Sequence, residues 1–516
     1  MKKFRYIIPL LLTILASCGK SSEPEVKPAN PAIRVEITSV DAFGATLSFQ
    51  CIQTSKVQYG YGKTEGDASR LANSVQTEGT GSVKVQVALN DLEPNTHYFL
   101  CARGIGPNAE EGAVTKVEFT TSVGPDNLYS WERGRSGVPS FADITICTRG
   151  QHNYNPPLWT AERFAPHVSY KDGTTEHWLF DAFLCIEGFD GARGLTMSIV
   201  ANGRSSAIKE SWEELMDYWF KSDGMLSALD EAVGNAARRI GAPKHPRYVV
   251  LTLPDPIMLQ VFSDKSSSTT YWGSLDGEVM NFSTVEHQWR VYRWFMDQCR
   301  ERFNKLAPKN LELAGFYVLS EELPLAQSFY TGLGLTGDTS ETWNAAYKRW
   351  EQLIPQASSY LNSCREGLWW IPYFYAPGYR VWKQMGFNMA WMQPNHYWDT
   401  SNQHPMSRSV TAMRQYGLGI ELEFEYSMVY DQMKNGRRGP DGAGNMIFTE
   451  DDIPALRGRL REYLNAYKEY GFYGERSIAM YSGTDAFTQL AQSPDSRDQE
   501  MYLEICRYIG ESPLKK

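Results

Sequence analysis

Two glutamates, Glu321 and Glu423, close two segments that have the composition of buried strands. Residues 311–320 form a mostly apolar run that leads into Glu321, and residues 417–426 carry a glutamate at every other position near their end. If these segments are the fourth and seventh strands of a parallel barrel, both carboxylates lie at its C-terminal face. Such a pair can cleave a glycosidic bond, because one acid protonates the leaving oxygen while the other attacks the anomeric carbon.

Alternation of side chains along a strand orders the acids of the second segment. Glu421, Glu423 and Glu425 share one face, and apolar residues occupy the other. Three neighbouring carboxylates repel one another unless donors or cations surround them, and a face covered by helices would bury them at high cost. The pattern therefore favours a functional face. We predict that Glu423 is the nucleophile, that Glu421 orients it or binds sugar, and that Glu425 is the second choice as nucleophile.

The same alternation selects between the two acids of the fourth strand. Tyr317 and Glu321 share a face, whereas Glu322 lies on the other. We therefore predict that Glu321 is the general acid/base. The alternative is that Glu321 serves only as a first-turn acid of the next helix, because a helix N-terminus attracts negative charge.

The elements that must position these acids begin near Asp143. We predict strands at 143–148, 177–187, 248–253, 313–320, 368–374, 389–393, 418–424 and 477–481. Amphipathic segments predict helices at 212–220, 226–240, 286–304, 341–363, 407–416, 453–470 and 498–509. Eight strands with helices between them predict a (β/α)₈ TIM barrel over residues 126–512. An open doubly wound sheet is the alternative, and it is disfavoured because polar residues follow many strands rather than one switch point.

Polar and aromatic side chains at several strand ends suit sugar hydroxyls and the apolar sugar face. Taken singly, each of these side chains is better explained as a packed ring or a turn residue. Only their shared position after barrel strands favours a substrate-binding role for the group. The predicted substrate-binding residues are Asp181, Asp255, Tyr317, Tyr373, Tyr375, Gln393, Asn395, His396, Glu421, Glu425 and Tyr481.

Residues 436–444 form a glycine-rich segment after the seventh strand. They lack the Lys-Ser/Thr ending of a phosphate-binding loop, so we predict a loop that brings Arg437 or Arg438 over the cleft. The histidines are too scattered to form a metal site, and no metal or other cofactor is predicted.

A different pattern precedes the barrel. Residues 32–122 contain short alternating strands separated by turn residues, which predicts a β-sandwich. Residues 92–98 resemble the approach to the tyrosine corner of fibronectin type III domains, and the resemblance covers most of this segment. Cys51 and Cys101 fall on facing strands, so a disulfide between the sheets is a minor alternative to two buried thiols.

The first 17 residues have a basic start, a short apolar run and a small-residue ending, which predicts a secretory signal. The ending Leu15-Ala-Ser-Cys18-Gly resembles a bacterial lipobox with Cys18 as the lipidated residue, and 18–31 reads as a polar linker. Membrane anchorage through Cys18 and an outer-membrane location are therefore predicted, on an undecided face of that membrane.

Charge limits the partners. The chain has 51 basic and 60 acidic residues, and removal of the signal takes away three basic residues and shifts the net charge from −9 to −12. That balance disfavours nucleic acid and, more weakly, highly sulfated or uronate-rich glycans. The sequence does not indicate an oligomeric state.

The barrel segment also resembles the exported bacterial family named domain of unknown function 4855. The resemblance rests on Gly315-Phe-Tyr317 with Glu321, Ile371-Pro-Tyr373, Gly386-Phe387, Gln393-Pro-Asn395 and Gly419-Ile-Glu-Leu-Glu423. Val318 departs from the pattern, where an aromatic residue is expected. The family looks like a glycosidase-type barrel and implies little about substrate. Signal, sandwich and barrel together look like glycan-degrading lipoproteins of Bacteroidetes.

Three functions follow as hypotheses. The first is a retaining glycoside hydrolase acting on an oligosaccharide or polysaccharide. The second is a glycan-binding lipoprotein without catalysis, and the third is a structural surface protein. The position of the two acids relative to one cleft separates the first from the others.

Overall fold

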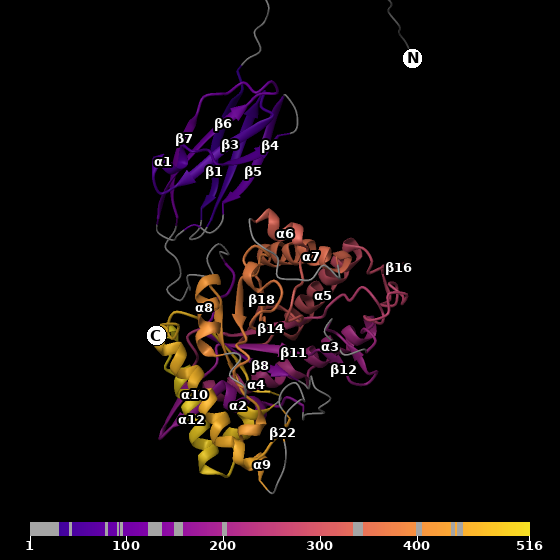
Figure 1. The fold of residues 1–516 in the computed structure, drawn as a ribbon, viewed down its shortest axis with the longest axis vertical. Helices are drawn as coiled ribbons and strands as arrows, with labels where there is room; N and C mark the ends of the chain where they lie inside the picture. The colour runs from indigo at the N-terminus through magenta and orange to yellow at the C-terminus, as the bar shows by residue number, and fades with distance from the viewer. Residues whose placement is uncertain are drawn as a thin grey trace, which may run out of the picture. The chain divides into compact units, whose positions relative to one another are not determined.

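The computed structural model describes residues 30–40, 44–77, 81–89, 92, 96–121, 137–148, 158–198, 204–333, 344–398, 405–434, 439–440, 447–483 and 485–515. They form two compact units, one built from the N-terminal strands and one from Thr121 onwards (Figure 1). Cys18, Arg437 and Arg438 lie outside the described residues, as does the signal segment. Over the described ranges, no helix is long and apolar enough to cross a membrane.

The first unit consists of two antiparallel sheets with a short helix, α1 (Glu65–Ala68). One sheet has the order β1-β2-β5 and the other the order β4-β3-β6-β7. The strands are β1 (Ala32–Val40), β2 (Ala45–Ile52), β3 (Lys56–Gly62), β4 (Asn73–Gln76), β5 (Ser82–Leu89), β6 (His97–Ile105) and β7 (Thr115–Thr120). Alternate residues of β2, such as Leu47 and Phe49, are fully buried. The prediction of a sandwich is confirmed at this level, because the unit consists of two antiparallel sheets and β2, β3 and β6 contribute buried apolar residues.

The two cysteines of this unit do not form a disulfide. Cys51 on β2 and Cys101 on β6 are both buried free thiols, so the minor alternative of a bridge between the sheets is wrong. Burial raises the pKa of the Cys51 thiol, as expected for a small apolar core residue.

The second unit contains the predicted closed barrel of eight parallel strands. In chain order these are β8 (Asp143–Thr148), β11 (Ala182–Ile186), β14 (Arg247–Leu253), β17 (Leu311–Val318), β18 (Gly367–Trp370), β19 (Met389–Met392), β20 (Gly419–Glu423) and β23 (Ile478–Tyr481). Each strand pairs with its neighbour in sequence, and β23 pairs with β8 to close the ring. The fourth and seventh strands are therefore β17 and β20, as predicted.

Helices surround the barrel (Figure 1). They are α2 (Ala161–Val168), α3 (Lys209–Phe220), α4 (Met225–Ile240), α5 (Val285–Leu306), α6 (Gln327–Gly332), α7 (Asn344–Ser363), α8 (Met406–Tyr416), α9 (Tyr430–Met433), α10 (Ile453–Glu469), α11 (Ala486–Gln492) and α12 (Ser496–Gly510). Short strand pairs decorate the loops: β9 (Ser169–Asp172) with β10 (Thr175–Trp178), β12 (Phe189–Asp190) with β13 (Leu195–Thr196), β15 (Ser274–Leu275) with β16 (Glu278–Val279), and β21 (Gly439–Pro440) with β22 (Ile447–Phe448).

Two predicted elements differ from the structure. The predicted second strand, 177–187, is in fact the end of the β9–β10 hairpin followed by β11, because Gly173 turns the chain at a φ of 61°. The predicted rhythm also fails between β18 and β19, where only a 3₁₀ turn at Tyr379–Val381 replaces a helix. Pro372, Pro377 and Gly378 in that connection explain the failure, because prolines and glycines disfavour a continuous helix.

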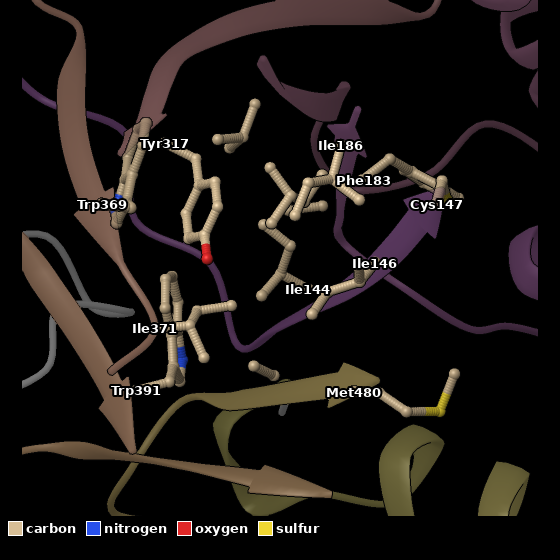
Figure 2. Close-up of a cluster of buried hydrophobic side chains, with 14 of the residues drawn as sticks. Ile144, Ile146, Cys147, Phe183, Ile186, Tyr317, Trp369, Ile371, Trp391 and Met480 are labelled. Carbon is tan, nitrogen blue, oxygen red and sulfur yellow. The ribbon is translucent and has the colours of Figure 1, made fainter. Parts of the chain in front are cut away.

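Register fixes which residues enter the barrel. Tyr317 pairs with Trp369 across β17 and β18, and Figure 2 shows both rings inside the barrel with Trp391 and Ile144. Glycines on neighbouring strands make room for the indoles. A Cβ on Gly419 would stand 2.6 Å from Trp391 Cδ1, and one on Gly315 would stand 2.8 Å from Trp369 Cζ3. The interior of the barrel below the C-terminal ends of its strands, here called the lower barrel, is thus a packed apolar core rather than a channel.

An ionic cluster closes the base of the barrel, where the strands begin. Lys515 Nζ lies 2.7 Å from Asp143 Oδ2, and Arg247 Nη1 lies 2.9 Å from Asp181 Oδ1. The backbone N–H of Asp181 donates to Asp143 Oδ1 at 2.8 Å. Asp181 precedes β11, so it lies at the opposite end from the predicted acids, and its prediction as a substrate-binding residue is wrong. The predicted strand 177–187 joined the end of the hairpin to β11, and this error placed Asp181 inside the strand rather than before it.

We expect Lys515→Met to lower the free energy of unfolding by about 3–5 kcal/mol, because Asp143 is fully buried and would lose its cation. Burial already raises the pKa of Asp143 to about 7, with Lys515 opposing the rise. Without Lys515 that pKa rises further, so the loss should be larger at pH 8 than at pH 5. Denaturant unfolding at both pH values measures it. Lys305→Met, at an exposed position near the end of α5, is the control, and an equal loss in both variants would contradict this role.

Candidate active site

The acids of β20 point into the barrel. Thr145 on β8 hydrogen-bonds His167 of α2, so Thr145 faces outward. Register pairs Thr145 with Met480, and Met480 with Leu422, so Leu422 also faces outward. Its neighbours in sequence, Glu421 and Glu423, must then face inward. Both are fully buried.

Glu423 is held by two donors on one carboxylate oxygen. Its Oε2 accepts the Tyr463 hydroxyl at 2.5 Å and the backbone N–H of Asn395 at 2.9 Å. Tyr463 also accepts the backbone N–H groups of His396 and Tyr397, at 3.0 and 2.9 Å. The two backbone donors occupy the lone pairs of the Tyr463 hydroxyl oxygen, so its hydrogen is directed to Glu423. Both bonds favour the ionised form of Glu423.

Glu321 is held less firmly than Glu423, by one long hydrogen bond. It lies just beyond β17, and its Oε1 accepts from Gln393 Nε2 at 3.4 Å. Burial raises the pKa of Glu321, the bond to Gln393 opposes the rise, and the charge of Glu322 adds to it. Glu322 is turned to Tyr373, whose hydroxyl donates to it at 2.8 Å. Glu321 therefore favours the protonated state that a general acid needs.

One tripeptide touches both acids. Gln393 bonds to Glu321 through its side chain, and Asn395, two residues later, bonds to Glu423 through its backbone. Asn395 has a φ of 58°, a left-handed conformation that asparagine tolerates better than most residues. The loop after β19 thus brings the acids that follow β17 and β20 to one space. Repulsion agrees, because the charge of Glu321 raises the pKa of Glu423.

Glu421 is the deepest of the three acids. Among the residues that the structure describes, neither of its carboxylate oxygens has a hydrogen-bond partner, and both oxygens are buried. Burial raises its pKa well above the ordinary value of 4.5, and the charges of Glu423 and Glu321 raise it further. Glu421 therefore favours its protonated form. A neutral Glu421 lessens the cost of ionising Glu423 beside it.

Glu425 lies two residues beyond β20 and is held by Tyr481. Its Oε1 accepts the Tyr481 hydroxyl at 3.3 Å, and it is only 7% exposed. Its other oxygen packs against Gly483, where a Cβ would stand 2.0 Å away. Gly483 has a φ of 56°, so a glycine suits both the backbone and this contact. Glu425 therefore positions Tyr481 rather than facing open space.

The remaining predicted residues divide into two groups. Tyr317 is close to the acids, since the charges of Glu321, Glu421 and Asp255 all raise its pKa after burial does. Asp255, which follows β14, thus belongs to the same region and is 3% exposed. His396 instead contacts Glu462 of α10, and Tyr375 is 47% exposed with its hydroxyl bound by Arg408.

Sequence reasoning missed the residue that holds Glu423. Tyr463 lies on α10, where Tyr467, four residues later, donates to the Glu421 carbonyl at 2.7 Å. The two tyrosines share the apolar face of an amphipathic helix, and such rings are usually core residues. The available signal was the pair of hydroxyls on the helix that follows the Glu-rich strand.

Comparisons with known proteins add a family. No curated protein matches. A β-glucuronidase from Bifidobacterium dentium is 9% identical, with a TM-score of 0.29, over 88% of this chain and 61% of that one. The chitinase ChiW of Paenibacillus sp. str. FPU-7 is 11% identical, with a TM-score of 0.34, over 95% of this chain and 42% of that one.

The third fibronectin III domain of human KIAA0343 protein covers 21% of this chain and 95% of its own, at 18% identity and a TM-score of 0.14. None of these likenesses is strong enough to carry an argument about activity. Residues 143–438, more than half of the sequence, match a family description that covers β8 to β20 and both predicted acids. The chain therefore belongs to the family described as domain of unknown function DUF4855.

Proposed function

We propose that the barrel is a glycoside hydrolase with Glu423 as nucleophile and Glu321 as general acid/base. The observation that carries the proposal is the unequal hydrogen bonding of two acids that follow the fourth and seventh strands. Glu423 has two donors on one oxygen, which favours a carboxylate. Glu321 has one long bond from an amide, which leaves it free to carry a proton.

In the first step Glu321 gives its proton to the glycosidic oxygen as the bond to the anomeric carbon breaks, and a Glu423 oxygen bonds to that carbon. In the second step Glu321 takes a proton from water, and the water oxygen displaces Glu423. The sum is one bond hydrolysed with both acids restored. Retention requires carboxyl groups about 5–5.5 Å apart. Their shared contact with the tripeptide 393–395 favours that closeness over the wider spacing of inverting enzymes.

The substrate we propose is an exposed sugar chain. Tyr317, Tyr481 and Tyr373 lie near the acids and offer hydroxyls and rings for sugar hydroxyls and apolar sugar faces. We also propose that the N-terminal sandwich is a fibronectin type III spacer and that Cys18 carries the lipid, so that the barrel works at a membrane surface.

One observation favours the second candidate, a glycan-binding barrel without catalysis. Burial raises the pKa of Glu423 to about 8, with Tyr463 and Asn395 opposing the rise. A nucleophile with that pKa is mostly protonated at pH 7. A hydrolase that uses Glu423 as nucleophile should therefore gain activity as Glu423 ionises, for as long as Glu321 keeps its proton. A binding protein would show no turnover at any pH.

We expect Glu321→Gln and Glu423→Gln each to lower turnover roughly 10²–10⁴-fold, because each removes one proton-transfer or bond-forming group. Tyr463→Phe should reduce turnover less and move the acid limb of the pH–rate profile upward, because Glu423 loses a donor. Reducing-sugar release from a panel of glycans measures all three. Glu312→Gln, at the far end of β17, is the control. Full activity in Glu423→Gln would refute the nucleophile, and binding without release in the wild type would favour the second candidate.

We expect Glu421→Gln to stabilise the protein at pH values above 4.5, the ordinary pKa of a glutamate. In the folded state Glu421 stays protonated, whereas in the unfolded state it ionises, so its cost appears above pH 4.5 and grows until the folded pKa is passed. The variant should match wild type at pH 4 and exceed it by on the order of 1–3 kcal/mol at pH 8. Urea unfolding across this range tests it. The exposed control Glu301→Gln should show no such trend, and a pH-independent difference would contradict the assignment.

We expect Cys18→Ser to release the protein from the membrane fraction of a bacterial host that lipidates lipobox cysteines. Wild type should partition into the detergent phase after Triton X-114 separation, while the variant stays in the aqueous phase, because the acyl chains supply the membrane affinity. Cys364→Ser, a partly exposed cysteine of the barrel unit, is the control. Aqueous partition of the wild type would rule out the anchor.

A further inference from the structure

A polar cavity lies away from the acids. Its volume is about 370 Å³, and its described lining residues are Arg380, Lys383, Gln384, Arg414, Gln415, Tyr416, Gly417 and Arg476. Gly417 and Arg476 precede β20 and β23, so the cavity is near the base of the barrel, whereas Glu423 is at the far end of β20. Four lining residues are cations and none is an acid, in a chain whose net charge is −9.

The cations converge rather than spread. Lys383 Nζ and Arg476 Nη1 lie 2.8 and 4.0 Å from the point where a Cβ on Gly417 would stand. Burial lowers the pKa of Arg476, and the charge of Arg414 lowers it further against the opposing charge of Glu475. Like charges held this close repel each other, and an anion between them would remove that cost.

Fixed contacts hold the cations in place. Trp382 Nε1 donates to the Tyr416 carbonyl at 2.9 Å, which ties the 379–384 segment to the end of α8. Arg414 and Arg476 both lie over the ring of Phe472, at 5.4 and 5.9 Å from its centroid. The cavity is therefore organised before any ligand arrives, and less entropy is lost on binding.

One of the four cations also sits at helix ends. Arg414 lies in the last turn of α8 and donates to the Tyr470 carbonyl at the end of α10. A helix C-terminus carries about half of one negative charge and therefore favours a cation there. The cavity that the four cations line has a size that matches small-molecule sites.

We propose that this cavity binds a phosphate or sulfate group, either as the free ion or carried on a small sugar. Arginine and lysine side chains are the usual ligands of such oxyanions, and planar guanidinium groups can bind them with two parallel bonds. Gln384 and Gln415 supply amides for hydroxyls next to the charged group. The site is independent of the proposed hydrolysis, because it lies at the other end of the strands.

The test measures thermal unfolding and calorimetric binding with sodium phosphate, sodium sulfate, a hexose phosphate and the uncharged hexose. Sodium chloride at matched ionic strength corrects for screening. The variants are Lys383→Gln, Arg414→Gln and Lys383→Glu, and both positions are exposed. Lys305→Gln is the control, because Lys305 is also an exposed cation in the last turn of a helix.

The midpoint of wild type and Lys305→Gln should rise with phosphate or sulfate beyond the rise with chloride, by mass action on the folded state. Lys383→Gln and Arg414→Gln should each bind at least about tenfold more weakly. Lys383→Glu should abolish the response and raise the midpoint without anion, since its carboxylate replaces the ligand. Tighter binding of the hexose phosphate than of phosphate would identify a sugar-borne group. No response beyond chloride in wild type, or equal responses in all variants, would overturn the proposal.

Discussion

Strand register is the constraint on which the rest of this structure depends, because a shift of one residue would turn every inward side chain outward. Leu422 faces the helices only because it pairs with Met480, which pairs with the outward Thr145. The same register sets Gly315 and Gly419 against the indoles of Trp369 and Trp391. Since no other residue fits at those two glycines, the packed lower barrel locks the register that presents the acids above it.

The three glutamates on one buried face differ in the hydrogen-bond donors that they receive. Glu423 receives donors from two different elements, Glu425 is held by Tyr481, and Glu421 receives none. Burial and mutual repulsion raise the pKa values of both Glu421 and Glu423, and only Glu423 has donors that oppose the rise. Because α10 supplies the donor to Glu423, the electrostatics of the strand depend on a helix that packs outside the barrel.

Most of the barrel could be predicted from the sequence because apolar runs and amphipathic segments report burial directly. The strand at 143–148 and the helix ending at Tyr416 have their predicted bounds to within a residue. Asp181 was misplaced because the end of the hairpin strand β10 is followed within four residues by the barrel strand β11, and the two were taken as one strand. Tyr463 escaped because a hydrogen bond between a helix and a distant strand end leaves no local pattern. Side-chain partners depend on tertiary geometry, and one sequence does not report it.

The ionic cluster at the base has a consequence for how the chain folds. Lys515 contacts Asp143, and β23 pairs with β8, so the start and end of the barrel meet in space. Contacts between residues so distant in sequence form late and slowly, since a long loop must be closed first. The ring can be completed only after β23 has emerged from the ribosome. Until then the paired edge of β8 stays exposed, so a nascent chain of this protein should depend on chaperones until β23 arrives.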